Sequence, residues 1–142
     1  MRRSLKSLLF RFPHLKTGLN RWEEELLRYT RDKGPIVARV IGYTMTHDME
    51  GSDWVGDSYL FSRLRRLADR GVPHPFLSLS GPTTTIRGSE VALTDFGAKA
   101  LEGAANFVEL NGINDWIGGV HLESGKGKLW FRRHDTLVVA GS

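Results

Sequence analysis

Residues 57–101 constrain the fold of this chain more than any other stretch, because they contain a helix pattern, two short β-segments and a second helix start. Within 58–70, apolar residues recur at i, i+4, i+7 and i+8, which predicts an amphipathic helix. Gly71 is suited to ending that helix, and Pro73 prevents its continuation. The apolar positions are Leu60, Leu64, Leu67 and Ala68, and the arginines expected on the other side are Arg63, Arg65, Arg66 and Arg70.

A β-hairpin and a capped helix are predicted next. Residues 76–79 alternate apolar and polar side chains with period two, Gly81-Pro82 form a turn, and 83–93 are rich in β-branched residues. Thr94 is suited to capping the helix that follows. A helix, a hairpin and another helix in succession predict a mixed α+β fold.

Shorter helices are predicted before this stretch. Residues 4–12 have apolar side chains at i, i+3, i+4 and i+7, as in a short amphipathic helix. Asn20 is a suitable N-cap, and Glu23 three residues later completes a capping-box pattern. Residues 36–43 are expected to form a further short helix, because Pro35 suits the first position of a helix.

The C-terminal part is rich in glycine, which indicates tight turns or close approach of the backbone. Residues 120–123 and 128–132 flank the polar segment 124–127 and predict a β-hairpin, and 136–139 predict a final strand. We expect one domain with three parts. These are an N-terminal helix and linker at 1–19, a core at 20–102, and a glycine-rich β extension at 103–142.

Two sets of motifs resemble known families. The helix, the hairpin and Leu93-Thr94-x-x-Gly97-x-x-Ala100-Leu101 resemble the end of a winged-helix domain of the bacterial transcription-regulator type, in which Leu-Thr-x-x-Gly closes the wing. A wider set resembles the C-terminal module of bacterial proteins catalogued as a domain of unknown function. Its elements are Gly18-Leu19, Trp54-Val55-Gly56-Asp57, the Leu-Thr-x-x-Gly element and Leu110-Asn111-Gly112-Ile113-x-x-Trp116-Ile117-Gly118-Gly119-Val120-His121-Leu122.

The resemblance extends from about Phe12 to Trp130 and implies a winged-helix-like core. In the resembled proteins the module usually follows a separate N-terminal domain, so this chain is either a free-standing relative or a piece of a longer protein. The resemblance implies no catalytic residues, because none is established for the family.

Composition excludes several kinds of chemistry. The 142 residues include no cysteine, so a thiol nucleophile, a disulfide framework and a thiolate zinc site are excluded. Arg2 and Arg3 precede an apolar run, but Lys6 and Arg11 interrupt it, and no window approaches the roughly 18 apolar residues that span a bilayer. We expect a soluble, cytoplasmic bacterial protein without a membrane partner.

The charge distribution points to nucleic acid. The net charge of +4 is divided unequally, with +5 on residues 1–71 and −1 on 72–142. A basic face on a helix is typical of a duplex DNA footprint, although arginines are also common on solvated helices and winged helices also serve as protein contacts. The candidate nucleic-acid-binding residues are Arg63, Arg65, Arg66, Arg70, Arg87 and Lys99.

The glycine-rich segment 112–122 is a second candidate site. An aromatic wall with a few polar groups is how a small-ligand pocket is built, and the same surface suits self-association or a protein partner. The plainer interpretation is that Trp116 is a core residue and that the glycines allow the backbone to pass close to it. The candidate pocket or interface residues are Asn111, Asn114, Trp116, Gly118, Gly119 and His121.

Metal binding and catalysis have less support. The cluster His47, Asp48, Glu50 and Asp53 lacks the register of a calcium-binding loop, so we expect a solvated acidic loop and no metal site. The chain contains no phosphate-binding Walker loop and no Gly-x-Ser-x-Gly element. We therefore predict a binding module, regulatory in role, and neither an enzyme nor a cofactor-dependent protein.

Overall fold

The computed structural model describes residues 12–46, 56–117, 120–124, 129–133 and 136–140. These residues form a mixed α+β structure of five helices and three two-stranded antiparallel sheets. The helices are α2 (Arg21–Lys33), α3 (Val37–Thr46), α4 (Asp57–Leu67), α5 (Asp95–Leu101) and α6 (Phe107–Asn111). The strands are β1 (Leu77–Ser80), β2 (Glu90–Leu93), β3 (Asn114–Ile117), β4 (Val120–Glu123), β5 (Leu129–Arg133) and β6 (Thr136–Ala140).

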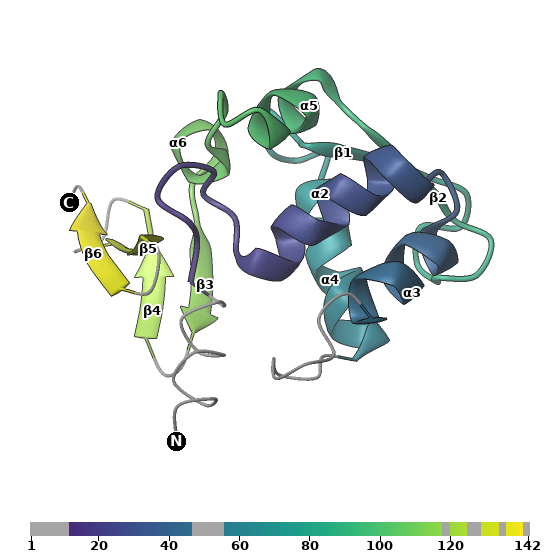
Figure 1. The fold of residues 1–142 in the computed structure, drawn as a ribbon, viewed down its shortest axis with the longest axis horizontal. Helices are drawn as coiled ribbons and strands as arrows, with labels where there is room; N and C mark the ends of the chain where they lie inside the picture. The colour runs from purple at the N-terminus through teal and green to yellow at the C-terminus, as the bar shows by residue number, and fades with distance from the viewer. Residues whose placement is uncertain (1–11, 47–55, 118–119, 125–128, 134–135, 141–142) are drawn as a thin grey trace.

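Two groups of elements lie side by side, with α6 between them (Figure 1). Helices α2 to α5 pack around the β1–β2 hairpin, and strands β3 to β6 form the other group. None of the helices in the described ranges is long and apolar enough to cross a lipid bilayer.

Helix α2 begins with the predicted capping box, which is confirmed. The Asn20 side chain accepts a hydrogen bond from the Glu23 amide at 2.8 Å, and the Glu23 carboxylate accepts one from the Asn20 amide at 2.9 Å. These two bonds satisfy backbone donors that the first turn of a helix leaves unpaired. The helix predicted at 36–43 is also confirmed, although it begins at Val37, two residues after Pro35, and extends to Thr46.

Helix α4 is shorter than its periodicity predicts. It ends at Leu67, and the Leu67 carbonyl accepts a hydrogen bond from the Phe76 amide at 2.9 Å. Gly71 therefore does not terminate the helix, because the chain has already turned toward β1, and its amide bonds the Asp69 side chain at 2.8 Å. The prediction of a helix to Arg70 with Gly71 as its end is wrong by about one turn.

The β1–β2 hairpin is joined by a third short segment. Strands β1 and β2 pair from Leu77 opposite Leu93 to Ser80 opposite Glu90. Ile36, just before α3, forms an isolated antiparallel bridge with Glu90. The strand predicted at 83–93 is correct only from Glu90 onward, because Ser89 Oγ bonds the Thr85 carbonyl at 2.7 Å and folds the preceding residues into a loop.

The predicted hairpin between 120–123 and 128–132 is wrong in its pairing. Strand β4 pairs with β3 instead, and β5 pairs with β6, which confirms the final strand. Only Gly118 and Gly119 separate β3 from β4 in the sequence, and a Gly-Gly pair favours a two-residue hairpin connection. The helix predicted at 4–12 falls almost entirely outside the described residues, and so does most of the acidic loop.

Two hydrophobic cores meet at α6. The larger core contains the buried faces of α2, α3, α4 and the β1–β2 hairpin, and it includes Phe107 of α6. The smaller core consists of Phe12, Val108, Ile113, Leu122 and Phe131. Adjacent residues of α6, Phe107 and Val108, thus enter different cores, so this short helix connects the two groups of elements.

Candidate nucleic-acid interface

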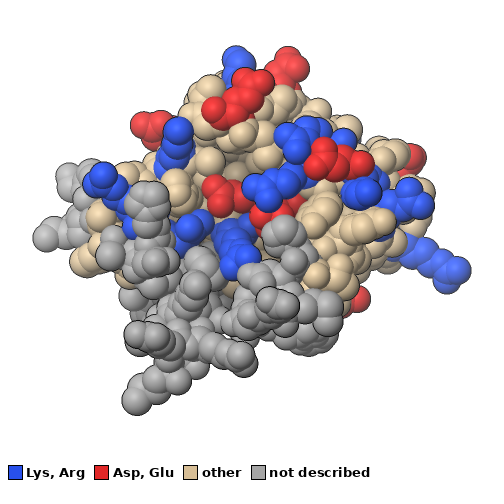
Figure 2. Space-filling model, viewed as in Figure 1, with Lys and Arg blue, Asp and Glu red and all other residues tan. Residues whose placement is uncertain are grey.

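Basic side chains do not form one continuous field on the face drawn in Figure 2. Lys and Arg side chains alternate there with Asp and Glu side chains, and the two kinds meet near the middle of the face. A charged surface of this kind favours local contacts over a broad electrostatic attraction. The position of each arginine therefore matters more than the net charge.

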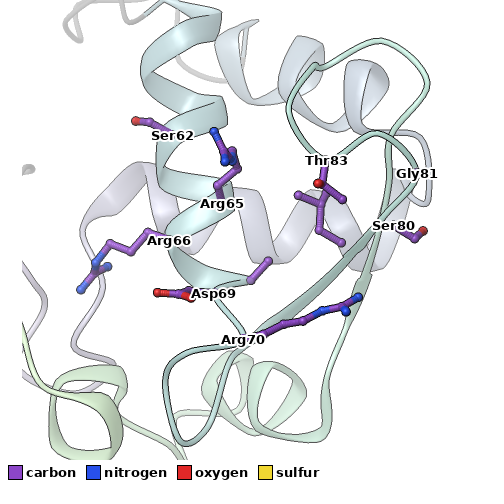
Figure 3. A pocket seen from close by; sticks show the side chains of 10 residues that line it. Ser62, Arg65, Arg66, Asp69, Arg70, Ser80, Gly81 and Thr83 are labelled. Carbon is purple, nitrogen blue, oxygen red and sulfur yellow. The ribbon is translucent and has the colours of Figure 1, made fainter.

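A groove of about 890 Å³ lies between α4 and the start of the loop that joins β1 to β2 (Figure 3). Three arginines and three hydroxyl side chains contribute to its walls. The lining residues are Ser62, Arg65, Arg66, Ala68, Asp69 and Arg70 on the α4 side, and Leu79, Ser80, Gly81 and Thr83 on the hairpin side. Guanidinium and hydroxyl groups are the donors that proteins use to bind phosphate oxygens.

Arg65 and Arg70 are the exposed arginines of this groove. Arg65 lies on the solvent side of α4, and its guanidinium carbon is 5.8 Å from the centre of the Phe61 ring. Arg70 follows the helix and extends toward the side of the groove that Ser80 lines (Figure 3). Asp69 lies between them in the sequence and adds one negative charge to the same groove.

Arg63 and Arg66 face α2, so the expectation that all four arginines share one solvent-facing side is wrong for these two. Glu23 Oε2 lies 2.5 Å from Arg66 Nη1 and 3.8 Å from Arg63 Nη1. Arg66 also stacks over Phe107, with 4.6 Å between its guanidinium carbon and the ring centre. The side chain of Arg66 is only 24% exposed and that of Arg63 only 17%.

The partly buried position of Arg63 could have been predicted from the helical periodicity, although its positive charge suggests an exposed side chain. Arg63 comes three residues after Leu60 and four before Leu67, and both of these leucines are fully buried. Residues at i+3 and i+4 lie on the same face of a helix, so the periodicity places Arg63 at the border of the core. No comparable local signal identifies Glu23 as its partner, because 40 residues separate the two in the sequence.

The other two candidate arms of the interface lie outside the groove lining. Arg87 is exposed in the loop between β1 and β2, and its carbonyl accepts a hydrogen bond from Thr85 Oγ1 at 3.0 Å. Lys99 is exposed on α5, with its ammonium 5.1 Å from the centre of the Phe96 ring. Neither residue is among those that line the groove.

The glycine-rich candidates divide between structural contacts and strand positions. The Asn111 side chain accepts a bond from the His74 amide at 2.7 Å and donates one to the His74 carbonyl at 2.9 Å. Trp116 and His121 are opposite each other in the β3–β4 ladder, and Asn114 is opposite Glu123. Gly118 and Gly119 lie outside the described residues.

A second, smaller cavity of about 300 Å³ lies where the 14–19 loop, α2 and the end of α5 meet. Glu24 is one of its walls, and its carboxylate accepts a bond from Thr17 Oγ1 at 2.7 Å and lies 3.4 Å from Arg132. Burial raises the pKa of Glu24, while the Thr17 hydrogen bond and the positive charge of Arg132 act in the opposite direction. This carboxylate is a structural link between α2 and β5 that sequence analysis did not identify.

No group of three or more His, Asp or Glu side chains is placed to hold a metal ion within the described ranges. The cluster His47, Asp48, Glu50 and Asp53 lies outside those ranges. Comparison of the sequence with known protein families and with curated proteins found no match.

Proposed function

We propose that this chain is a winged-helix-like module that binds duplex DNA through the groove between α4 and the β1–β2 loop. The order α2, α3, α4, β1, β2, with Ile36 bridging β2, supports a winged-helix arrangement. In that arrangement α4 is the recognition helix and residues 81–89 are the wing. The role we propose for this module is sequence-specific regulation of transcription.

The observation that carries the proposal is that exposed arginines and hydroxyl side chains line the same groove. Arg65 and Arg70 supply positive charge, and Ser62, Ser80 and Thr83 supply neutral donors on both walls. Phosphate contacts of this kind fix the position of a protein on a duplex. An exposed helix beside them has the dimensions to enter the major groove.

The experiment is fluorescence anisotropy with a labelled random duplex, titrated across salt concentration. Each phosphate that the protein neutralises contributes about 0.9 to the slope of log K against log salt. Arg65→Met and Arg70→Met should each lower that slope by about 0.9, because each substitution removes one guanidinium from the groove. Asp69→Asn should tighten binding, because it removes the negative charge that opposes phosphate there.

Arg31→Met is the matched control. Arg31 is an exposed arginine of α2 that pairs with Asp32 at 2.8 Å and does not line the groove. The Arg31→Met substitution removes one positive charge from a different surface, so the slope of log K against log salt should not change. Absence of wild-type binding at low salt would overturn the proposal and favour a role in protein contact.

A further inference from the structure

We propose that Glu23 is an internal counterion that withdraws Arg66 from phosphate binding, and so sets how many phosphates the α4 groove engages. This inference rests on the proposed DNA-binding function. It concerns a residue of α2 that does not itself line the groove.

Glu23 is fixed in place by two sets of contacts. One carboxylate oxygen completes the capping box with the Asn20 amide at 2.9 Å. The other accepts a hydrogen bond from Arg66 at 2.5 Å and lies 3.8 Å from Arg63. With only 3% of its side chain exposed, Glu23 cannot turn outward without breaking the cap of α2.

Arg66 is the arginine for which Glu23 and a phosphate would compete. It lines the groove together with Arg65, yet its guanidinium is bonded to a buried carboxylate. An ion pair with one partner buried is weakly screened by salt, and its geometry is already formed before any ligand arrives. A phosphate must therefore displace an existing partner to bind Arg66.

Arg65 provides the contrast on the same helix. It is exposed in the groove, and its guanidinium lies over the Phe61 ring. Within the described part of the chain, no carboxylate forms an ion pair with it. These two consecutive arginines both line the groove, but Arg65 is exposed, whereas Arg66 is 24% exposed and is bonded to the Glu23 carboxylate. The groove therefore binds phosphate with fewer arginines than the three that line it, because Arg66 is already paired with Glu23.

The test compares Arg65→Met with Arg66→Met in the duplex titration. Methionine keeps an apolar stem, so the packing of residue 66 on Phe107 is largely retained. Arg65→Met should lower the salt slope by about 0.9, whereas Arg66→Met should leave it unchanged. Equal losses in the two variants would overturn the counterion role and leave the DNA-binding proposal intact.

Glu23→Gln supplies the opposite signature. Removing the carboxylate charge should raise the slope by about 0.9, because Arg66 then becomes available to phosphate. Adding Arg66→Met to Glu23→Gln should return the slope to the wild-type value. Loss of stability alone lowers the fraction of active protein and does not raise the slope, so a purely structural role of Glu23 predicts no increase.

Glu102→Gln is the charge-matched control, since it removes an exposed glutamate outside the groove lining and should leave the slope unchanged. Circular dichroism establishes that each variant is folded. Should Glu23→Gln fail to fold, the Arg65 and Arg66 variants still decide the question. Absence of duplex binding by the wild-type protein overturns both proposals, whereas binding with an unchanged slope in folded Glu23→Gln overturns this one alone.

Discussion

Glu24, next to the proposed counterion, has its carboxylate in a different environment. Its side chain is 26% exposed, and it faces Thr17 from the N-terminal loop, Arg132 from β5, and Glu25 and Arg28 from its own helix. Burial raises its pKa above the ordinary value of 4.5. The folded protein therefore keeps this proton to a higher pH than the unfolded chain does.

Glu24→Gln should reveal that linkage in the pH dependence of stability. The free energy of unfolding of the wild-type protein, relative to Glu24→Gln, should be constant at low pH and fall as pH rises from about 4.5 through the pKa of folded Glu24. Urea denaturation of both proteins between acidic and neutral pH measures the difference. A wild-type protein that gains stability over the variant as pH rises would show that the Arg132 contact outweighs burial.

Some side-chain roles could be predicted from sequence and others could not. Asn20 and Thr94 are caps as expected, because a cap acts on an amide three residues away. The pairing of Arg66 with Glu23 joins residues 43 positions apart, and nothing local encodes it. Charge alone therefore identified the arginines of α4 without distinguishing those that are internally paired.

At the scale of secondary-structure elements, α5 is placed against Phe76, the residue just before β1, by a close backbone approach at Gly97. A Cβ atom at this position would lie 2.1 Å from the Phe76 carbonyl oxygen. Thr94 strengthens the same junction, because its hydroxyl bonds the Pro75 carbonyl at 2.7 Å. Only glycine fits between this helix and the Phe76 backbone without moving one of them.

Gly97→Ala should therefore destabilise the protein by about 2–3 kcal/mol, the upper part of the range for overpacking in a well-packed interior. Gly42→Ala on α3 is the matched control, since a Cβ there meets no atom within 4 Å. It should stabilise the protein by about 0.5–1 kcal/mol through its higher helix propensity. Thermal or urea denaturation of the two variants measures both effects, and equal stabilities would contradict the close packing of α5 on Phe76.

Element boundaries were predictable where the signal was local. The start of α2 and the cap of α5 follow from a few adjacent residues. The end of α4 was missed because it depends on the bond between the Leu67 carbonyl and the Phe76 amide. The pairing of β4 was missed because alternation identifies a strand but does not identify its neighbour.

At the scale of the whole molecule, several contacts couple the two cores. Phe107 and Val108 enter different cores from the same helix, α6. The backbone of Arg132 in β5 also bonds the N-terminal loop, donating to the Pro13 carbonyl at 2.7 Å and accepting from the Leu15 amide at 2.9 Å. Glu24 adds a side-chain contact from α2 to the same arginine. We expect these connections to make the two groups of elements unfold together.

Leu122→Ala tests that cooperativity from the smaller core. Leu122 is fully buried in β4, so its truncation should cost about 2–5 kcal/mol through lost apolar contacts and the cavity that remains. Most of the helix lies in the other group of elements, and with coupled cores the helical signal at 222 nm should melt in one transition at a lower temperature. Leu15→Ala, which truncates a leucine that is 38% exposed, should change stability by less than about 0.5 kcal/mol. A helical transition that stays at the wild-type temperature in Leu122→Ala would mean that α6 and Arg132 join the cores without coupling their stabilities.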